Sequence, residues 1–202
     1  MTASPPDTQN SADKVDRALL QQIAQDSNVA AMNTLYNSYR AKLMPFMLRM
    51  SPDQGLVEEA YNDVMLIIWK KAGQFSGDSK ASTWVFSIAY RQCLKLIKRQ
   101  QLKKKVLNSF QIFKHIDAEI EEHTHMSDNP KADQLNQAVA QLPAKQRAVI
   151  ELSYFQGRSI KEVSDIANCP ENTVKTRLFH ARQKIKSLMQ TAVFEDTDYE
   201  TP

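Results

Sequence analysis

Glycine is scarce in this chain, and this scarcity constrains the fold more than any other feature of the sequence. Only four of the 202 residues are glycine, namely Gly55, Gly73, Gly77 and Gly157, whereas glycine makes up about 7% of an average protein. β-Hairpins and phosphate-binding loops both use glycine, so β-rich folds and P-loop enzymes are disfavoured. All four glycines lie between segments with apolar residues at helical spacing, which predicts an all-α protein with loops near these positions.

The apolar pattern and the charge distribution predict two small helical domains joined by a flexible linker. We expect the N-terminal domain over 15–100 and the C-terminal domain over 133–190. Residues 101–132 start basic, turn acidic and contain Ser-Asp-Asn-Pro, which is typical of a linker. Residues 1–14 are expected to be a disordered leader, and 191–202 form an acidic tail.

Composition and simple sequence patterns indicate the cellular compartment of the chain and whether it spans a membrane. The longest unbroken apolar run, Val64–Trp69, has six residues, and a membrane-spanning helix needs about 20. The N-terminus has no apolar core of the kind that a secretory signal requires. The two cysteines, Cys93 and Cys169, form no CxxC pair, which favours a reducing compartment and small core thiols. We therefore expect a cytoplasmic protein without a membrane span.

The C-terminal segment has the pattern of a helix-turn-helix. Ser159 and Glu162 have the spacing of a capping box at the start of a short helix. Asn168 can take the positive φ that the turn needs, and a longer basic helix follows from Glu171. Its exposed face is expected to carry DNA-binding side chains: Asn172, Thr173, Lys175, Thr176, Arg177, His180 and Arg182. An ordinary helical hairpin with a solvated basic face is the alternative for this segment alone.

The N-terminal domain combines aromatic and basic residues in a loop and the helix after it. Stacking on an aromatic ring is how proteins hold an unstacked base, and basic residues bind the adjoining phosphates. The candidates are Phe75, Ser76, Lys80, Thr83, Trp84, Phe86, Tyr90, Arg91, Lys95 and Lys98. A place in the core is the alternative for Trp84 and Phe86, whereas Phe75 lies in a polar loop and is the better candidate for an exposed platform.

The preceding helix carries acidic and amide side chains away from its apolar stripe: Glu58, Glu59, Asn62 and Asp63. Such a face is most often simply solvated, but it could also dock a basic partner.

Both halves resemble bacterial RNA polymerase sigma factors of the small extracytoplasmic-function class. The carrying motifs are Glu59-Ala-Tyr-Asn-Asp-Val-Met65, Thr83-Trp-Val-Phe-Ser-Ile-Ala89, Gln141-Leu-Pro-Ala-Lys-Gln-Arg-Ala-Val-Ile150, Ser159-Ile-Lys-Glu-Val163 and Asn172-Thr-Val-Lys-Thr-Arg-Leu178. The resemblance implies that Glu58, Glu59, Asn62, Asp63 and Met65 bind core polymerase. It also implies that the aromatic and basic set captures the minus-ten element and that the second helix of the helix-turn-helix reads the minus-35 element. An anti-sigma protein is an implied further partner.

Two other functions are weighed against this one. A DNA-binding regulator would use the helix-turn-helix alone, as a dimer on a palindrome, and would not need the aromatic and basic segment or the acidic helix. An enzyme has no support, since no nucleophile, metal cluster or nucleotide loop emerges, and we expect no catalytic residue and no cofactor. His115, His123 and His125 lack a fourth ligand at zinc-finger spacing, so solvated histidines are favoured over a metal site.

Overall fold

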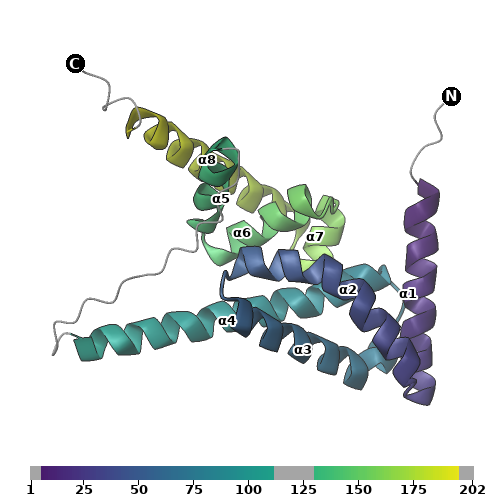
Figure 1. The fold of residues 1–202 in the computed structure, drawn as a ribbon. Helices are drawn as coiled ribbons and strands as arrows, with labels where there is room; N and C mark the ends of the chain where they lie inside the picture. Colours follow the sequence, from purple (N-terminus) through teal and green to yellow (C-terminus); the bar gives the residue numbers. More distant parts are fainter. Residues whose placement is uncertain (1–5, 112–129, 196–202) are drawn as a thin grey trace.

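The computed structural model describes residues 6–111 and 130–195, and these form helices joined by short connections (Figure 1). The N-terminal part contains α1 (Pro6–Asp26), α2 (Val29–Met50), α3 (Gln54–Lys71), the short 3-10 helix η1 (Ala72–Gln74) and α4 (Ala81–Gln111). The C-terminal part contains α5 (Pro130–Ala140), α6 (Ala144–Ile150), the π-helical turn η2 (Glu151–Phe155), α7 (Ile160–Ala167) and α8 (Glu171–Glu195). The described residues contain no strand, and an all-α fold is confirmed.

Three helices are longer than the sequence analysis expected. α1 begins at Pro6, so the expectation of a disordered leader over residues 1–14 is wrong from Pro6 onward. α4 continues to Gln111, because no glycine or proline interrupts it, and it therefore takes up the first part of the expected linker. α8 likewise extends to Glu195, into the expected acidic tail. The remainder of the linker and of the tail lies outside the described residues.

Local capping sets where several helices begin. The Asn28 side chain accepts a hydrogen bond from the Ala31 amide at the start of α2, and Asp53 does the same for the Leu56 amide at the start of α3. Such caps satisfy amides that would otherwise have no partner in the first helical turn. α2 continues through Pro45.

Helices α1–α4 share one apolar core. Leu35, Tyr39, Phe46 and Phe86 are fully buried in it, and the rings of Phe46 and Phe86 lie 5.7 Å apart. The Tyr39 hydroxyl donates to the Asp16 carboxylate at 2.6 Å, which gives these buried polar groups a partner. This contact fixes α1 on α2.

The C-terminal part has a smaller core between α6, α7 and α8. Val149, Leu152, Val163, Val174 and Ala181 are fully buried there. α5 packs against α8, and α7 packs against α4 of the N-terminal part, as Figure 1 shows. The two parts are therefore in contact.

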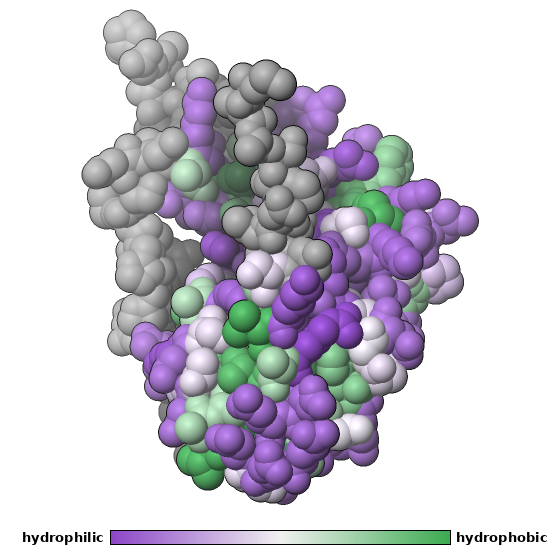
Figure 2. Space-filling model, turned by 90° about the vertical axis from the view of Figure 1, so that its right-hand side faces the viewer, coloured by the Kyte–Doolittle hydropathy of each residue, from purple (hydrophilic) through white to green (hydrophobic). Residues whose placement is uncertain are grey.

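The surface on the α1 side is mainly hydrophilic, and its apolar side chains form small separate patches (Figure 2). None of the described helices is both long enough and apolar enough to cross a membrane.

Candidate nucleic-acid interface

The turn geometry of the C-terminal part matches a helix-turn-helix in detail. Ser159 and Glu162 form the predicted capping box: the Glu162 amide donates to Ser159 Oγ at 3.2 Å, and the Ser159 amide donates to Glu162 Oε2 at 2.9 Å. Asn168 has φ 46° and ψ 58°, the predicted left-handed conformation. Gly157, shortly before α7, is also left-handed, with φ 62°.

The turn is held by one further contact that the sequence did not reveal. The Ser164 hydroxyl donates to the Cys169 carbonyl at 2.6 Å, so Ser164 ties the end of α7 to the residues before α8. Val174 is fully buried under α7. The crossing of α7 and α8 is therefore fixed from both sides of the turn.

The outer face of α8 presents most of the predicted DNA-binding side chains. Five of them are exposed: Asn172, Lys175, Thr176, His180 and Arg182. Thr173 and Arg177 are partly buried, and Arg177 Nη1 lies 3.4 Å from Cys169 Sγ. Hydroxyl, amide and cationic groups on one exposed helix face suit phosphates and base edges.

The aromatic and basic segment is divided between surface and core. Ser76, Lys80, Arg91, Lys95 and Lys98 are exposed. Phe75 directly follows η1 and Trp84 lies in the first turn of α4; both are half-buried, and their ring centroids lie 5.6 Å apart. These two rings are the available stacking surfaces of the segment.

Three residues expected at this surface are buried instead. Thr83 is 3% exposed, Phe86 0% and Tyr90 4%. Phe86 packs on Phe46, and the Arg158 guanidinium covers it 4.6 Å from the ring centroid. For Phe86 the core alternative was the better interpretation, and in this arrangement Thr83 and Tyr90 are not open to DNA either.

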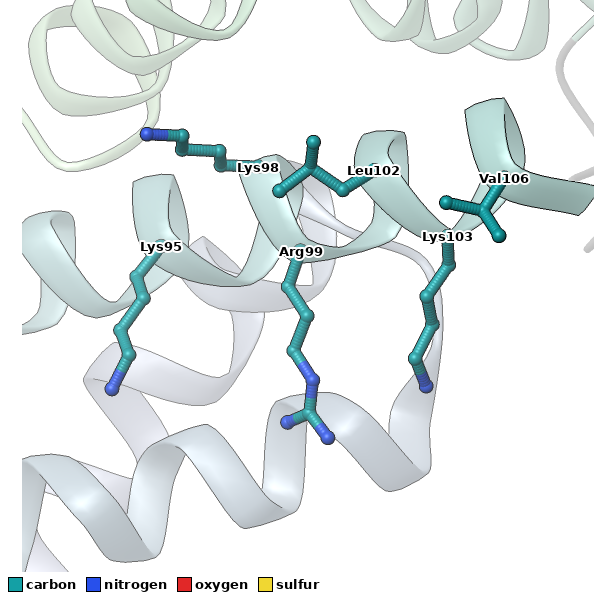
Figure 3. A pocket seen from close by; sticks show the side chains of 6 residues that line it. All are labelled: Lys95, Lys98, Arg99, Leu102, Lys103 and Val106. Carbon is teal, nitrogen blue, oxygen red and sulfur yellow. The ribbon is translucent and has the colours of Figure 1, made fainter.

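The basic face of α4 extends past the residues that the sequence analysis selected. Figure 3 shows Lys95, Arg99 and Lys103 leaving α4 on the same side, with Leu102 and Val106 beside them. Lys103 was missed because the linker was expected to begin at residue 101, whereas Arg99 lies inside the expected domain and was not selected. The four-residue spacing from Lys95 to Arg99 to Lys103 could have identified them, because residues four apart share a helix face.

The predicted docking face of α3 is on the surface. Glu59, Asn62 and Asp63 are exposed, and Glu58 is partly so. Arg40 lies 3.3 Å from Glu58, and Arg99 lies 3.8 Å from Glu59; both pairs are largely exposed, so they are weak.

Met65 does not belong to this face. It is 3% exposed and lies in the core, so its expected contact with polymerase is wrong for this arrangement. Leu66 is 49% exposed and follows Asn62 by four residues, so it shares the acidic face. The sequence analysis missed Leu66 because it assigned that position to the apolar run.

Several polar contacts join the two parts of the chain. Lys80 Nζ lies 2.9 Å from Glu162 Oε1, and Arg158 Nη1 donates to Ser82 Oγ at 2.9 Å. Arg49 Nε lies 2.7 Å from Glu151 Oε2. Each of these contacts places a side chain of α7 or of the segment before it on α2 or on the start of α4.

The two predicted DNA-reading surfaces meet at this contact. Burial raises the pKa of Tyr90 on α4, and the nearby charge of Arg177 on α8 acts to lower it. This part of α8 therefore lies close to the segment that is expected to bind the minus-ten element. Burial acts to raise the pKa of Glu162, but hydrogen bonds from Ser159 and Lys80 lower it overall. Glu162 is therefore charged at neutral pH and attracts Lys80.

The two cysteines lie in different surroundings, one buried and one partly exposed. Burial raises the pKa of Cys93 to about 12, and Cys169 lies in the turn beside Arg177. Among the described residues, no cluster of histidine, cysteine or acidic side chains is arranged to hold a metal ion. His115, His123 and His125 lie outside the described residues.

Comparison with known proteins gives the same division of the chain. The family model described as Sigma-70 region 2 matches residues 35–103, and that described as Sigma-70, region 4 matches residues 132–185. Together they cover more than half of the chain.

Individual relatives match over nearly their whole length. The chain is 27% identical to the ECF RNA polymerase sigma factor RpoE of Cereibacter sphaeroides, covering 88% of this chain and 98% of the relative. It is 28% identical to the ECF RNA polymerase sigma factor SigL of Mycobacterium tuberculosis, covering 81% and 92%.

Solved structures share the fold. CnrH, in complex with the cytosolic domain of CnrY, superposes with a TM-score of 0.63 at 18% identity, covering 88% of this chain and 98% of CnrH. The sigma factor RpoE of Bartonella quintana, in complex with the anti-sigma factor NepR, gives 0.60 at 20% identity, covering 80% and 98%. The two matched regions, in the same order as in these relatives, show that this chain belongs to the extracytoplasmic-function subfamily of RNA polymerase sigma factors.

Proposed function

We propose that this chain directs core RNA polymerase to specific promoters and starts transcription there, through three separate surfaces. The acidic face of α3, with Glu58, Glu59, Asn62 and Asp63, docks on core polymerase. The α3–α4 connection and α4 capture the minus-ten element, and α8 reads the minus-35 element.

The observation that supports this proposal is that one chain carries two surfaces of different chemistry. α8 offers exposed amide, hydroxyl and cationic groups, which suit an intact duplex. Phe75 and Trp84 offer π-faces beside Lys80 and Arg91, which suit a base that has left the stack. A reader of duplex DNA needs only the first surface.

Promoter opening then follows from differential binding rather than from covalent chemistry. Unstacking a base costs a few kcal/mol, and stacking on an aromatic side chain returns about 1–3 kcal/mol. A protein that holds the separated strand better than the duplex shifts the equilibrium toward the open state.

The contact between the two parts must open for this function. Glu162 forms an ion pair with Lys80, and α7 packs on part of α4. Arg177 lies near Tyr90. Separation of α7 from α4 would free the start of α4 and the inner edge of α8 together, and binding to core polymerase would supply the free energy for it.

We also propose control by an anti-sigma protein. The support is that a structural neighbour, the sigma factor RpoE of Bartonella quintana, was solved with its anti-sigma factor NepR. Co-purification from cells, followed by identification of any small protein bound together with polymerase subunits, tests this part of the proposal.

Transcription of a genomic fragment library by purified core polymerase tests the main role. With the chain present, we expect transcripts that start at a few defined positions preceded by a shared pair of sequence elements. If the chain binds DNA fragments but core polymerase still needs another sigma factor to start at them, the chain is a regulator and the proposal is wrong.

A further inference from the structure

Two residues of α1 hold the loop that carries Phe75, although their partners lie 60 or more positions away in the sequence. Arg17 Nη1 donates to the Gly77 carbonyl at 2.9 Å, and Arg17 Nη2 donates to the Ser79 carbonyl at 2.7 Å. Asp13 Oδ2 accepts from Arg17 Nε at 2.6 Å. One guanidinium thus binds both sides of the turn at residue 78.

Asp13 also fixes the helix that follows this loop. Its Oδ1 accepts a hydrogen bond from the Ala81 amide at 2.7 Å, at the first residue of α4. The first amides of a helix lack intrahelical partners, and a negative charge there is favourable. Asp13 therefore acts as the cap of α4 from a different helix, and α4 cannot rotate away from α1 without losing it.

The same guanidinium contacts the aromatic platform directly. Arg17 Cζ lies 5.3 Å from the centroid of the Phe75 ring, and the Trp84 ring lies 5.6 Å from it. A cation near an aromatic face is attracted to it. Phe75 is thus held by Arg17 and by Trp84 while it remains half-exposed.

The turn itself is shaped for this contact. Gly77 has φ +84°, and a Cβ atom on it would lie 3.0 Å from Arg17 Nη1. A side chain at this position would be strained by the backbone conformation and would also crowd the guanidinium.

We propose that Asp13 and Arg17 are positioning residues for promoter opening: they fix the 75–80 loop so that Phe75 is ready to receive an unstacked base. This inference rests on the proposed function. α1 lies wholly before residue 35, where the match to the Sigma-70 region 2 family model begins, so this role comes from a part of the chain that the family match does not cover.

The alternative role for Arg17 is a direct contact with a DNA phosphate. Its geometry argues against that role, because Nε, Nη1 and Nη2 each donate to a protein acceptor and Asp13 balances its charge. Arginine and lysine differ in a way that separates the two roles, since lysine keeps the charge but has no planar fork.

The test measures opening of duplex promoter DNA by the chain with core polymerase, using 2-aminopurine fluorescence at the minus-ten element. Four variants are compared with the parent: Arg17→Ala, Arg17→Lys, Phe75→Ala and the double variant Arg17→Ala/Phe75→Ala. Lys14→Ala is the matched control, because Lys14 is an exposed cation on the same helix. Thermal unfolding and competition for core polymerase are measured for every variant.

We expect Arg17→Ala to reduce the opening equilibrium roughly fivefold or more, as for a lost stacking contact, and to leave core binding unchanged. Arg17→Lys should share the defect, because it cannot bridge Gly77 and Ser79. The double variant should be no worse than Phe75→Ala, because Arg17 acts through Phe75, and a pre-melted template should restore part of the loss. Lys14→Ala should open DNA like the parent.

Two results would overturn the inference while leaving the proposed function intact. One is normal opening by Arg17→Ala when Phe75→Ala is defective. The other is a pair of findings: Arg17→Lys opens DNA like the parent, and DNA binding by Arg17→Ala depends less on salt, by about one phosphate contact. That pair would make Arg17 a DNA contact. A parent protein that opens no promoter with core polymerase would instead contradict the proposed function. If Arg17→Ala unfolds, Arg17→Lys decides the question by the same readouts.

Discussion

Arg49 and Glu151 form an ion pair at 2.7 Å between the last turn of α2 and the π-helical turn η2. Glu151 is fully buried, whereas Arg49 is 38% exposed at its side chain. The Arg49 guanidinium also lies 4.5 Å from the Phe155 ring centroid. Arg147 reinforces the site by donating to the Met50 carbonyl at 2.9 Å. This group of contacts holds the helix-turn-helix part against the N-terminal part.

Removal of Arg49 should therefore loosen the contact between the two parts. In Arg49→Ala, Glu151 would keep its burial but lose its main partner, which should cost about 1–3 kcal/mol after allowance for the exposure of Arg49. Urea unfolding measures that loss, and fluorescence energy transfer between labels on α3 and α8 measures the separation. Arg40→Ala is the control, since the Arg40–Glu58 pair is exposed on both sides. An unchanged distance and stability in Arg49→Ala would contradict this account of the contact.

Glu151 should make stability depend on pH. Burial raises the pKa of Glu151 to about 7, against the opposing effect of Arg49 and Arg147. Because the folded pKa lies above the unfolded value of about 4.5, the folded state binds more protons between these values. The contribution of Glu151 to stability is thus fully present below about pH 4.5 and declines as the pH rises to about 7.

Glu151→Gln isolates that contribution, because glutamine keeps an acceptor for Arg49 but does not titrate. Between pH 4.5 and 7, the parent should lose roughly 1–3 kcal/mol more unfolding free energy than the variant does. Urea unfolding across this range checks the difference. Parallel pH profiles for the two proteins would show that Glu151 titrates normally.

Lys175 should contribute to duplex recognition. It is exposed on the outer face of α8, so Lys175→Ala should weaken binding of the polymerase complex to a mapped minus-35 element. If Lys175 contacts a base, its loss should cost about 1–3 kcal/mol of binding free energy and relax the sequence specificity. If it contacts a phosphate, its loss should reduce the salt dependence of binding. Lys184→Ala, an exposed cation further along the same helix, is the control. Equal binding by Lys175→Ala and the parent at every salt concentration would remove Lys175 from the interface.

The acidic face of α3 should be needed for polymerase binding but not for folding. Reversal of Glu59 and Asp63 to Lys should weaken competition against another sigma factor for core polymerase. The free energy of unfolding should change by less than about 1 kcal/mol, because both side chains are exposed. Asp26→Lys, which reverses one exposed acid on α1, controls for charge reversal away from this face. Undiminished competition by the reversed protein would exclude this face as the docking site.

The features that could be predicted from sequence were those set by neighbouring residues. The capping box of Ser159 and Glu162 and the left-handed Asn168 depend on a few consecutive positions, and both are as predicted. The core positions of α8 follow from helical periodicity: Val174 and Ala181 are seven residues apart, so they share one helix face, and both are buried.

The features that could not be predicted depend on contacts between distant segments. Phe86 lies in a segment whose composition suits DNA binding, but Phe46 and Arg158 pack against its ring and make it a core residue. Arg17 binds carbonyls 60 and 62 residues away, and no local pattern encodes such a partner. The extent of α1 was missed in part for the same reason, because Asp13, whose partner is the Ala81 amide, looks like a leader residue when it is read alone.

Permanganate footprinting at a mapped start site tests the central claim most directly, because it reads strand separation itself. With the chain, core polymerase and duplex promoter together, thymines around the minus-ten element should become reactive, and none should react when any component is left out. Duplex thymines that stay unreactive with all three components present, on DNA that the chain demonstrably binds, would contradict the claim that this protein opens promoters as a sigma factor.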